Sequence, residues 1–566
     1  MLAAAWLFSL PPHEALVAAT LVGAVLLFVA LVAAHGRARV REQHARALRD
    51  LSHRGAARVR RDWSALPPAG EVIPRDHPYA VDLDVAGTSA SLYRLLDVVS
   101  PATGRPVLLR WLLAPASTTS ELLDRQSAVR ELTQLVALRD DLALLARRAQ
   151  EMSPEEFQRF LGWAEGPPWF ADRPALLWTT RIIPLLTIVT AVLAVLGRLP
   201  STAPGLSIIA GLLVLARYRT AMSEHLTSVL RHGTGLRPQR QMLDQLAAAK
   251  LSSPLLVLEQ ERAVGGIIAL RSLDRVLSLF EGQGSLIHAI FAAVLLWDAQ
   301  AIATLDRWRR RHGPRVRASL NALGIVEALA ALATLAYDNP SWQFPMVDAS
   351  ADRLTGKRLG HPLLPASVRV GNDVTVGPAG TLLLVTGSNM SGKSTLLRAV
   401  GLNAVLAQAG APVCADTLTM PMVDVRTSIR LADSLERGVS LFMAELERLK
   451  QIVDAARDTS RTRPLLYLLD EILHGTNTAE RLIAARTVLD HLVKAGAIGA
   501  VTTHDLTLAA DGALAGASRP VHFTEQVQSA PSGDGTQALA FDYKLRPGLA
   551  TSTNALKLLA LVGLDK

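Results

Sequence analysis

A glycine-rich stretch, "GSNMSGKS" at residues 387–394, most constrains what this 566-residue chain can fold into. It fits the pattern G-x-x-x-x-G-K-[ST] and follows the apolar run "TLLLVT". The segment after it, "TLLRAVGLNAVLAQAG", has helical spacing of apolar residues and ends in a glycine. The pattern therefore predicts a buried strand, a loop whose backbone amides surround phosphate groups, and a helix, in direct succession. Such a unit belongs to an α/β sheet.

This loop also predicts individual roles. Lys393 is expected to reach the β- and γ-phosphates of a nucleotide, and the Ser394 hydroxyl is expected to bind Mg²⁺. The predicted nucleotide-binding residues of the loop are Gly387, Ser388, Asn389, Met390, Ser391, Gly392, Lys393, Ser394 and Thr395.

Two later segments read as buried strands that end in polar side chains. "RPLLYLLDEILHGT", residues 463–476, ends in Asp470, predicted to hold the Mg²⁺ shell through water, and Glu471, predicted to orient or deprotonate the attacking water. "AIGAVTTHDL", residues 497–506, ends in His504, which can reach a γ-phosphate from there. The alternatives are solvated acids at a strand end and a structural histidine. With Lys393, the predicted catalytic residues are Glu471 and His504.

Ser440 precedes a predicted helix from about residue 441 to 456. The start of such a helix is an anion site, and in ATPases that dimerise head to tail it completes the partner's nucleotide site. The alternative is an ordinary N-cap. Ser440 is therefore a predicted nucleotide-binding residue that acts on the partner chain.

The N-terminal region contains twenty residues without a charge, 15–34, which is the length that spans a membrane as a helix. No lysine or arginine precedes it and no convincing cleavage site follows, which disfavours a secretory signal. Residues 35–63 carry nine arginines against three acids. Since positive charge stays on the cytoplasmic side, the N-terminus is predicted outside and the following chain in the cytoplasm.

A second apolar region, residues 182–216, consists of two short runs joined by "RLPSTAP". Arg181 precedes the pair, and Arg217 and Arg219 follow it. These charges favour a membrane hairpin with both ends in the cytoplasm, giving about three spans in total. The alternative is a buried helical hairpin of a soluble domain, since each run is near the minimum spanning length.

A third apolar run, residues 286–305, carries His288 and is interrupted by Asp298. It is interpreted as a core helix of the cytoplasmic part, because a charge at mid-membrane is costly. The basic patch "RWRRRHGPRVR", residues 307–317, fits a solvated helix end near anionic lipid headgroups, and the other interpretation is a contact to nucleic-acid phosphates.

Composition fits these assignments without choosing a partner. Half of the chain is hydrophobic and the mean hydropathy is +0.25, which leans towards membrane segments. The net charge of +9, mostly from arginine, suits nucleic acid or anionic lipid but also arises from cytoplasmic loops alone. A single cysteine, Cys414, excludes a disulfide framework within the chain and fits a reducing compartment.

The C-terminal motifs, in this order, resemble the ATPase domain of the MutS mismatch-repair family, a branch of the ABC ATPase class. The matching stretches are "TGSNMSGKSTLLRAVGLNAVLAQAGAPVCAD", "SLERGVSLFMAELERLKQIV", "LLYLLDEILHGTNTAERLIAA" and "VTTHDLTLA". The closing "ALAFDYKLRPGLATSTNALKLLALVGL" is similar to the family's final strand pair and helix. Upstream, "SLYRLLDVVSPATGRPVLLRWLLAP" and "GIVEALAALATLAYDNPSWQFP" resemble the start and end of its helical core domain.

Several features depart from that family. No segment before residue 90 resembles the mismatch-reading module, and the apolar hairpin stands where the family has lever helices and a DNA clamp. The aromatic residue that stacks on adenine is missing before Asn372, where Arg369 and Val370 stand. Leu473 and His474 follow the acids where the family usually has glycine and arginine. The resemblance therefore implies an intact ATPase without a recognisable DNA reader.

The predicted fold is a C-terminal α/β P-loop domain of the ABC type, preceded by an all-α core domain with about three transmembrane helices. The predicted domains are an N-terminal transmembrane anchor, a basic juxtamembrane segment, a helical MutS-like core with the hairpin near 182–216, and the ATPase domain: 1–36, 37–90, 91–340 and 341–566.

The resulting hypothesis is a membrane-anchored, Mg²⁺-dependent ATPase. Two chains are expected to form a homodimer with composite ATP sites and to couple ATP hydrolysis to conformational change. The family resemblance implies DNA binding or repair, with double-stranded DNA as an open partner and an unknown protein partner as another. The location expected is the inner, cytoplasmic membrane, multi-pass, with the ATPase domain in the cytoplasm. The alternatives are an ABC-type, transporter-like machine, which the missing "LSGGQ" signature disfavours, and a membrane scaffold with a silent ATPase.

Overall fold

The computed structural model describes residues 12–68, 76–87, 89–278, 294–388, 390–430, 441–473, 478–505, 508, 512–529 and 537–549. Residues 1–57 and 58–566 form two separate compact units. The predictions for Asn389 and Ser440 lie outside the described residues, as do those for His288 and the start of the third apolar run.

The first unit consists of most of helix α2 (Pro12–Arg60), which contains the uncharged stretch and the basic residues after it in one continuous helix. Its large apolar side chains are exposed along the helix, and Phe28, for example, is 67% exposed. From Thr20 to Arg60 the helix is long and apolar enough to cross a membrane. A continuous apolar surface of this kind is rarely left in water, which favours the predicted membrane anchor. The anchor itself stays a prediction.

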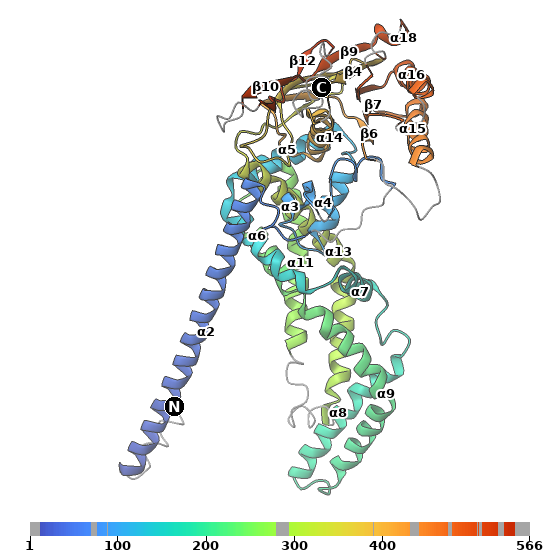
Figure 1. Cartoon of the computed structure of the whole chain (residues 1–566). Coiled ribbons are helices and arrows are strands. Elements are labelled where there is room, and N and C mark those ends of the chain that lie inside the picture. The colour runs from blue at the N-terminus through green and yellow to red at the C-terminus, as the bar shows by residue number, and fades with distance from the viewer. Residues whose placement is uncertain are drawn as a thin grey trace. The chain divides into compact units, whose positions relative to one another are not determined.

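Helix α13 (Trp297–Asp338) forms the centre of the helical region, and α11 and α4 pack against it (Figure 1). The other helices here are α3 (Leu92–Leu96), α4 (Gly104–Leu113), α5 (Thr119–Gln134), α6 (Val136–Arg148), η1 (Ala149–Glu151), α7 (Pro154–Glu165), α10 (Arg237–Ala248) and α11 (Pro254–Ser278). The most apolar part of α13 is 78% buried within the protein, which fits a core helix. The helix ends before Pro340, as expected for a residue that cannot continue it.

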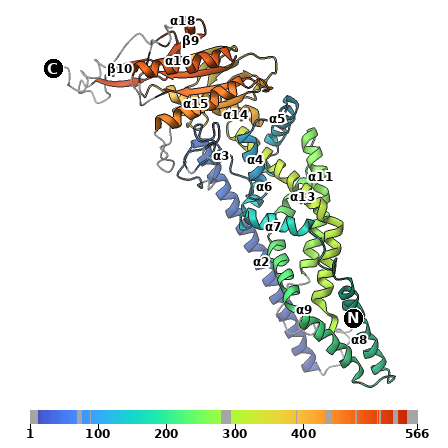
Figure 2. The ribbon, with the colours of Figure 1, turned by 90° about the vertical axis from the view of Figure 1, so that its right-hand side faces the viewer.

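Helices α8 (Pro174–Val195) and α9 (Ala203–Thr234) form a hairpin at the end of the helical region remote from the sheet (Figure 2). Large apolar side chains on both helices are exposed: Leu185 is 61% exposed and Leu206 76%. Both helices are long and apolar enough to cross a membrane. They extend beyond the predicted range of 182–216 at both ends, because the polar flanks keep helical geometry after the apolar pattern stops.

The C-terminal region contains a six-stranded sheet in the order β12-β9-β4-β8-β7-β6, parallel except for β12. Its strands are β4 (Thr381–Thr386), β6 (Asp424–Ser428), β7 (Leu465–Asp470), β8 (Ile498–Thr503), β9 (Ser518–His522) and β12 (Arg546–Pro547). A second sheet, in the order β1-β5-β2-β3, contains β1 (Met346–Val347), β2 (Leu354–Leu359), β3 (Asn372–Val376) and β5 (Thr417–Met420). Strands β10 (Glu525–Ser529) and β11 (Gln537–Phe541) form an antiparallel pair.

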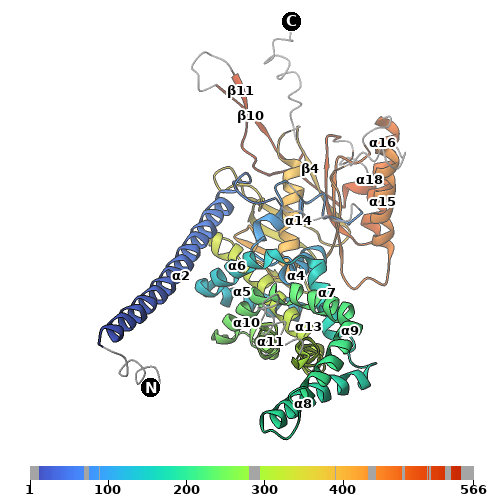
Figure 3. The ribbon, with the colours of Figure 1, turned by 90° about the horizontal axis from the view of Figure 1, so that it is seen from below.

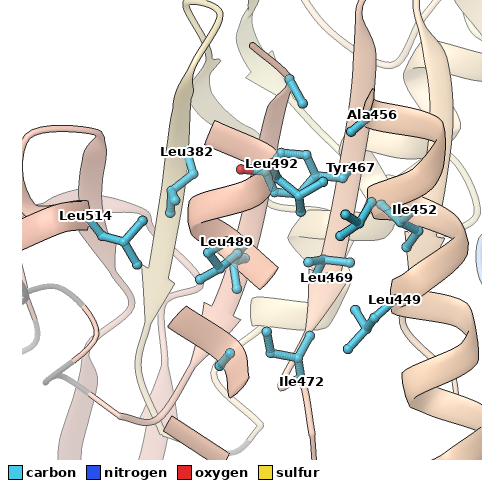
Figure 4. Packing of buried hydrophobic residues seen from close by; sticks show 14 of the residues in the cluster. Leu382, Leu449, Ile452, Ala456, Tyr467, Leu469, Ile472, Leu489, Leu492 and Leu514 are labelled. Atoms are coloured by element: carbon cyan, nitrogen blue, oxygen red, sulfur yellow. The ribbon is translucent and has the colours of Figure 1, made fainter. Parts of the chain in front are cut away.

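Helices cover the six-stranded sheet. Helix α14 (Lys393–Ala409) contacts β7 and β8, and it also contacts α4 and α5 of the helical region. Helices α15 (Leu441–Arg457) and α16 (Thr478–Lys494) lie side by side away from α14 (Figure 3), and α18 (Gly512–Ala515) follows. Their apolar faces share one core with the strands (Figure 4), which includes Leu382, Tyr467, Leu469, Leu449 and Leu489. The result is an all-helical region followed by an α/β region, as predicted.

A segment far away in the sequence, residues 76–87, runs along the edge strand β6. The Thr427 amide donates to the Pro78 carbonyl at 3.0 Å. The buried Asp82 carboxylate accepts from the Thr427 hydroxyl (2.8 Å), from the Ile429 amide (2.9 Å) and from the Arg448 guanidinium on α15 (3.0 Å). We call this arrangement the β6 cover. It fastens the chain that follows α2 to the end of β6.

Candidate nucleotide-binding site

The loop between β4 and α14 has the backbone that its glycines allow. Gly387 has a φ of 144° and Gly392 a φ of 103°, a region that favours glycine. A Cβ at Gly387 would lie 3.0 Å from the Ser391 Oγ and 3.2 Å from the Phe523 carbonyl oxygen. The Ser391 hydroxyl is buried and has no hydrogen-bond partner in the part of the chain that the structure describes. Buried hydroxyl groups normally have a hydrogen-bond partner, so a bound ligand is expected to supply the partner of this one.

Lys393 occupies the space inside this loop. Its Nζ donates to the carbonyl oxygens of Gly387 (3.0 Å) and Ser388 (2.9 Å), and it lies 3.3 Å from Glu471 Oε1. The side chain is only 4% exposed. A buried ammonium group needs such partners, and the oxygens of a phosphate are the same kind of partner.

One cavity of about 540 Å³ connects the predicted groups. From the loop and α14 it is lined by Ser388, Met390, Ser391, Gly392, Lys393, Ser394 and Thr395, and from the end of β7 by Asp470 and Glu471. The remaining lining residues include His361, Val368, Val370, Asn372, Phe523 and Tyr543. This volume is typical of small-molecule sites. The structure therefore brings together most of the residues that the sequence predicted for phosphate, Mg²⁺ and water.

The two acids at the end of β7 are held by β8. Asp470 accepts from the Thr502 hydroxyl, and the Glu471 amide donates to the Thr502 carbonyl at 3.2 Å. His504 Nε2 lies 2.5 Å from Glu471 Oε1. His504 does not line the larger cavity; with Glu471 it lines a smaller one of about 60 Å³ beside it. The histidine thus contacts the predicted general base, and its predicted contact to a γ-phosphate stays a prediction.

The segment after the acids is strained. Glu471 has a φ of 46° and Leu473 a φ of 65°, values that cost a side-chain-bearing residue about 1–2 kcal/mol each. Leu473 stands where the family usually has glycine, and the backbone retains the conformation that glycine favours. The Leu473 amide donates to the buried Glu445 carboxylate on α15. This bond connects the helix that follows Ser440 to the segment that follows Glu471.

Tyr543 is one of the site residues that the sequence predictions missed, together with His361 and Phe523. It lines the cavity, is 42% exposed, and lies so near the loop that a Cβ on Gly392 would be 3.2 Å from its ring. Its carbonyl accepts from the Asn372 side chain at 2.9 Å, which fixes this segment beside β3. Arg369, in contrast, donates to the Leu364 carbonyl and to Cys414 Sγ and lines a different cavity. An aromatic wall is therefore present, although it comes from the C-terminal segment.

His361 gives this cavity a neutral wall. Burial, with Arg398 and Arg369 nearby, lowers the pKa of His361 to about 4. The ring therefore carries no charge at neutral pH, and its Nδ1 accepts from the Leu363 amide at 3.2 Å. A neutral, largely buried side beside a charged phosphate loop suits a ligand with one anionic and one uncharged end.

Comparisons with known proteins agree with the motifs. A family model described as MutS domain V matches residues 383–566. "DNA mismatch repair protein MutS" of Myxococcus xanthus is 27% identical over 521 residues, covering 81% of this chain and 56% of that protein. The protein of the same name from an Exiguobacterium species is 28% identical over 475 residues, covering 74% and 54%. "DNA mismatch repair protein MutS 2" of Halobacterium salinarum is 34% identical over 256 residues, covering 44% and 28%. The chain spans about half the length, or less, of these curated relatives.

Proposed function

We propose that this chain, a divergent member of the MutS family, is a membrane-anchored ATPase that binds and hydrolyses ATP with Mg²⁺. The observation that carries the proposal is the convergence of Lys393, Ser394, Asp470 and Glu471 on one cavity. These side chains come from the ends of two parallel strands that only β8 separates. Groups suited to phosphate, to Mg²⁺ and to a water molecule therefore face the same space.

Phosphate binding falls to Lys393 and the loop. The ammonium group leaves the carbonyl oxygens of Gly387 and Ser388, and the amides of the loop and of the first turn of α14 donate to the phosphate oxygens. The charge of Lys393 is already buried before binding, so the phosphate oxygens replace the carbonyl oxygens as its partners and the ammonium group needs no further desolvation.

Ser394 and Asp470 are the residues that would hold Mg²⁺, which when bound neutralises phosphate charge. Within the described ranges no group of three His, Cys, Asp or Glu side chains meets at one point. A magnesium ion here would therefore need phosphate oxygens and water as its other ligands, which is the usual arrangement for this ion.

Glu471 is the proposed general base. Its carboxylate faces the cavity and lies 2.5 Å from His504 Nε2 and 3.3 Å from Lys393 Nζ. When Lys393 turns to the phosphates, the Glu471 carboxylate loses this ion-pair partner and is free to accept a hydrogen bond from a water molecule. His504 Nε2 then donates a hydrogen bond to the carboxylate and holds it in position.

The proposal includes a head-to-tail dimer in which Ser440 of each chain completes the partner's site. Its support is the link between α15 and the catalytic segment through Glu445 and Leu473. Movement of the helix that follows Ser440 therefore reaches the residues next to Glu471. Helices α15 and α14 both contact β7, and α14, which begins at Lys393, also contacts α4 and α5. These contacts are the route by which the same movement would reach the helical region.

Membrane anchoring is proposed from α2 and from the hairpin of α8 and α9, whose apolar surfaces are exposed and long enough to span a bilayer. We place the chain in the inner, cytoplasmic membrane with the ATPase region in the cytoplasm. The relatives' names suggest a role in DNA repair, and double-stranded DNA is the proposed partner by family resemblance. The exposed hairpin favours a second candidate, an ATPase that acts on a membrane partner.

The substitution Glu471→Ala tests the proposed ATP hydrolysis and dimerisation. The variant should bind ATP, accumulate as a dimer in detergent, and hydrolyse ATP about 10²–10⁴-fold more slowly, the usual contribution of a general base. Lys393→Ala is the control that should bind ATP more weakly and should not accumulate as a dimer at the ATP concentration used for Glu471→Ala. If ATP leaves Glu471→Ala monomeric by light scattering, the dimer proposal is wrong.

The same trapped dimer tests the partner. It is isolated from membranes with ATP, with and without nuclease treatment. Partners that nuclease removes would support DNA, and a protein partner that withstands nuclease would support the membrane role.

A further inference from the structure

A basic groove between α11 and α13 has no part in the nucleotide site. It encloses about 610 Å³ and is lined by Arg307, Arg310, Arg311 and His312 of α13 and by Ser272 of α11. The three arginines lie at i, i+3 and i+4, so they share one helix face and repel one another. Each of the three is exposed.

These arginines lack the carboxylate partners that other arginines of the same helix have, although Arg307 donates to the Thr304 hydroxyl at 2.9 Å. Arg309 lies 3.7 Å from Asp306, and Arg317 contacts Glu165 through two bonds of 2.7 and 2.8 Å. Among the described residues, Arg307, Arg310 and Arg311 form no salt bridge. Three like charges gathered around one cavity without a carboxylate favour an anion as the missing partner.

The floor of the groove is rigid. The Trp308 indole stacks on Trp163 at 5.7 Å and 14° between the rings. Its Nε1 donates to the Ala269 carbonyl on α11 at 2.7 Å. Because the floor is fixed, the groove keeps its width, and a ligand would not have to order it.

The position of the groove in the fold indicates which kind of anion it binds. Gln300 of α13 donates to the Thr180 carbonyl of α8 at 2.6 Å, just before the apolar run of that helix. At that level Arg181 lies over the exposed Trp178 ring at 5.6 Å, a pair typical of a membrane–water interface. Arg307 follows Gln300 by seven residues, which is about 10 Å along the helix.

Side chains on a helix lean towards its N-terminus, which for α13 is the end beside the apolar hairpin. The arginines therefore point towards the headgroup layer, which is about 5–7 Å thick on each side of the hydrocarbon. Nucleic acid would instead need a row of cations that follows a phosphate backbone, whereas these surround a single cavity. Basic pockets at this depth suit anionic lipid headgroups.

We propose that the α11–α13 groove binds the phosphate headgroup of an anionic phospholipid in the membrane that the hairpin enters. This rests on the proposed membrane insertion. The bound headgroup fixes α13 relative to the bilayer surface, and α13 is the helix on which the helical region is built.

The test compares lipid retention by the full-length chain in detergent, using native mass spectrometry with added phosphatidylglycerol or phosphatidylcholine. The wild type should prefer phosphatidylglycerol. The triple variant Arg307→Gln, Arg310→Gln, Arg311→Gln should lose this preference by roughly 100-fold, if each arginine contributes about fivefold. Replacement of the same three by lysine should retain most of it, which separates lost charge from lost folding. A charge-matched control neutralises three exposed cations elsewhere: Arg353, Lys450 and Lys494.

Two further measurements decide the remaining outcomes. Carbonate extraction of membranes tests insertion: if the wild type is extracted, the membrane proposal fails and the groove proposal falls with it. If the chain stays inserted but the glutamine triple variant retains phosphatidylglycerol like the wild type, only the groove proposal is overturned. The groove proposal is also overturned if the glutamine triple variant loses duplex DNA binding, measured by fluorescence anisotropy, while its lipid preference is unchanged. If inorganic phosphate alone displaces phosphatidylglycerol from the wild type, the groove is a free-phosphate site instead.

Discussion

Glu327 on α13 offers a quantitative test of how the helical region is held together. Its side chain is 2% exposed and accepts from the Ser100 amide (2.7 Å), the Ser100 hydroxyl (3.0 Å) and the Thr103 hydroxyl, at the start of α4. Burial raises the pKa of Glu327 to about 7, and these hydrogen bonds oppose the rise. The substitution Glu327→Gln keeps an acceptor and removes the charge.

Linkage between protonation and folding determines whether the free energy of unfolding rises or falls with pH. Between the ordinary pKa of 4.5 and about 7, the folded chain holds a proton on Glu327 that the unfolded chain releases. Stability therefore falls as pH rises through this window and is constant above it. The whole difference amounts to about 3 kcal/mol at 1.36 kcal/mol per pKa unit. In Glu327→Gln this part of the pH dependence should vanish.

The assay is chemical unfolding of the full chain in mixed micelles, followed by tryptophan fluorescence from pH 4.5 to pH 8. The quantity of interest is the unfolding free energy of the wild type minus that of Glu327→Gln. It should decrease by about 3 kcal/mol across the window. Glu447→Gln, at an exposed position of α15, is the control. A difference that is constant with pH, or that increases with it, would refute the reasoning.

Three further predictions concern single positions. Lys393→Ala should weaken ATP binding about 10- to 150-fold, the equivalent of one charge-assisted hydrogen bond of about 1.5–3 kcal/mol, measured with a fluorescent ATP analogue. Tyr543→Ala should weaken it by about 1–3 kcal/mol if the ring stacks on the base, while Tyr543→Phe retains binding; equal affinities for both variants would contradict this contact. Gly313→Ala should destabilise the chain by about 2 kcal/mol or more, because the new Cβ would lie 2.1 Å from the Ala164 carbonyl oxygen. Gly162→Ala, whose Cβ meets nothing within 4 Å, should be neutral or slightly stabilising in a thermal melt.

Elements with a strong local signal could be predicted from the sequence. The stop before Pro340 ends α13 at Asp338, and the predicted helix after Ser440 begins at Leu441. The hairpin was predicted too short, because hydropathy marks the apolar part of a helix and helices continue into polar flanks. Its placement in a membrane stays a prediction, as do the domain boundaries.

The candidate site was predictable where topology alone brings residues together. Lys393 and Glu471 follow parallel strands of one sheet, and the carboxyl ends of such strands lie on one edge. Tyr543 follows no strand of that sheet. Its position depends on Asn372, 171 residues earlier, which accepts and donates bonds to the segment around it. The signal for this wall in the sequence is the pair of closely spaced aromatic residues, Phe541 and Tyr543, which lies far from Asn372 along the chain.

The β6 cover has a consequence for how this protein can be divided. Strand β6 is at the edge of the six-stranded sheet, and an uncovered edge strand is a template for association. A fragment that starts near residue 341 keeps every predicted nucleotide-binding residue but loses Pro78 and Asp82, and with them the partners of Thr427 and Arg448. Such a fragment should aggregate or exchange strands. The nucleotide-binding region and the residues just after α2 therefore have to be cloned, swapped between relatives and inherited together, although more than 300 residues separate them.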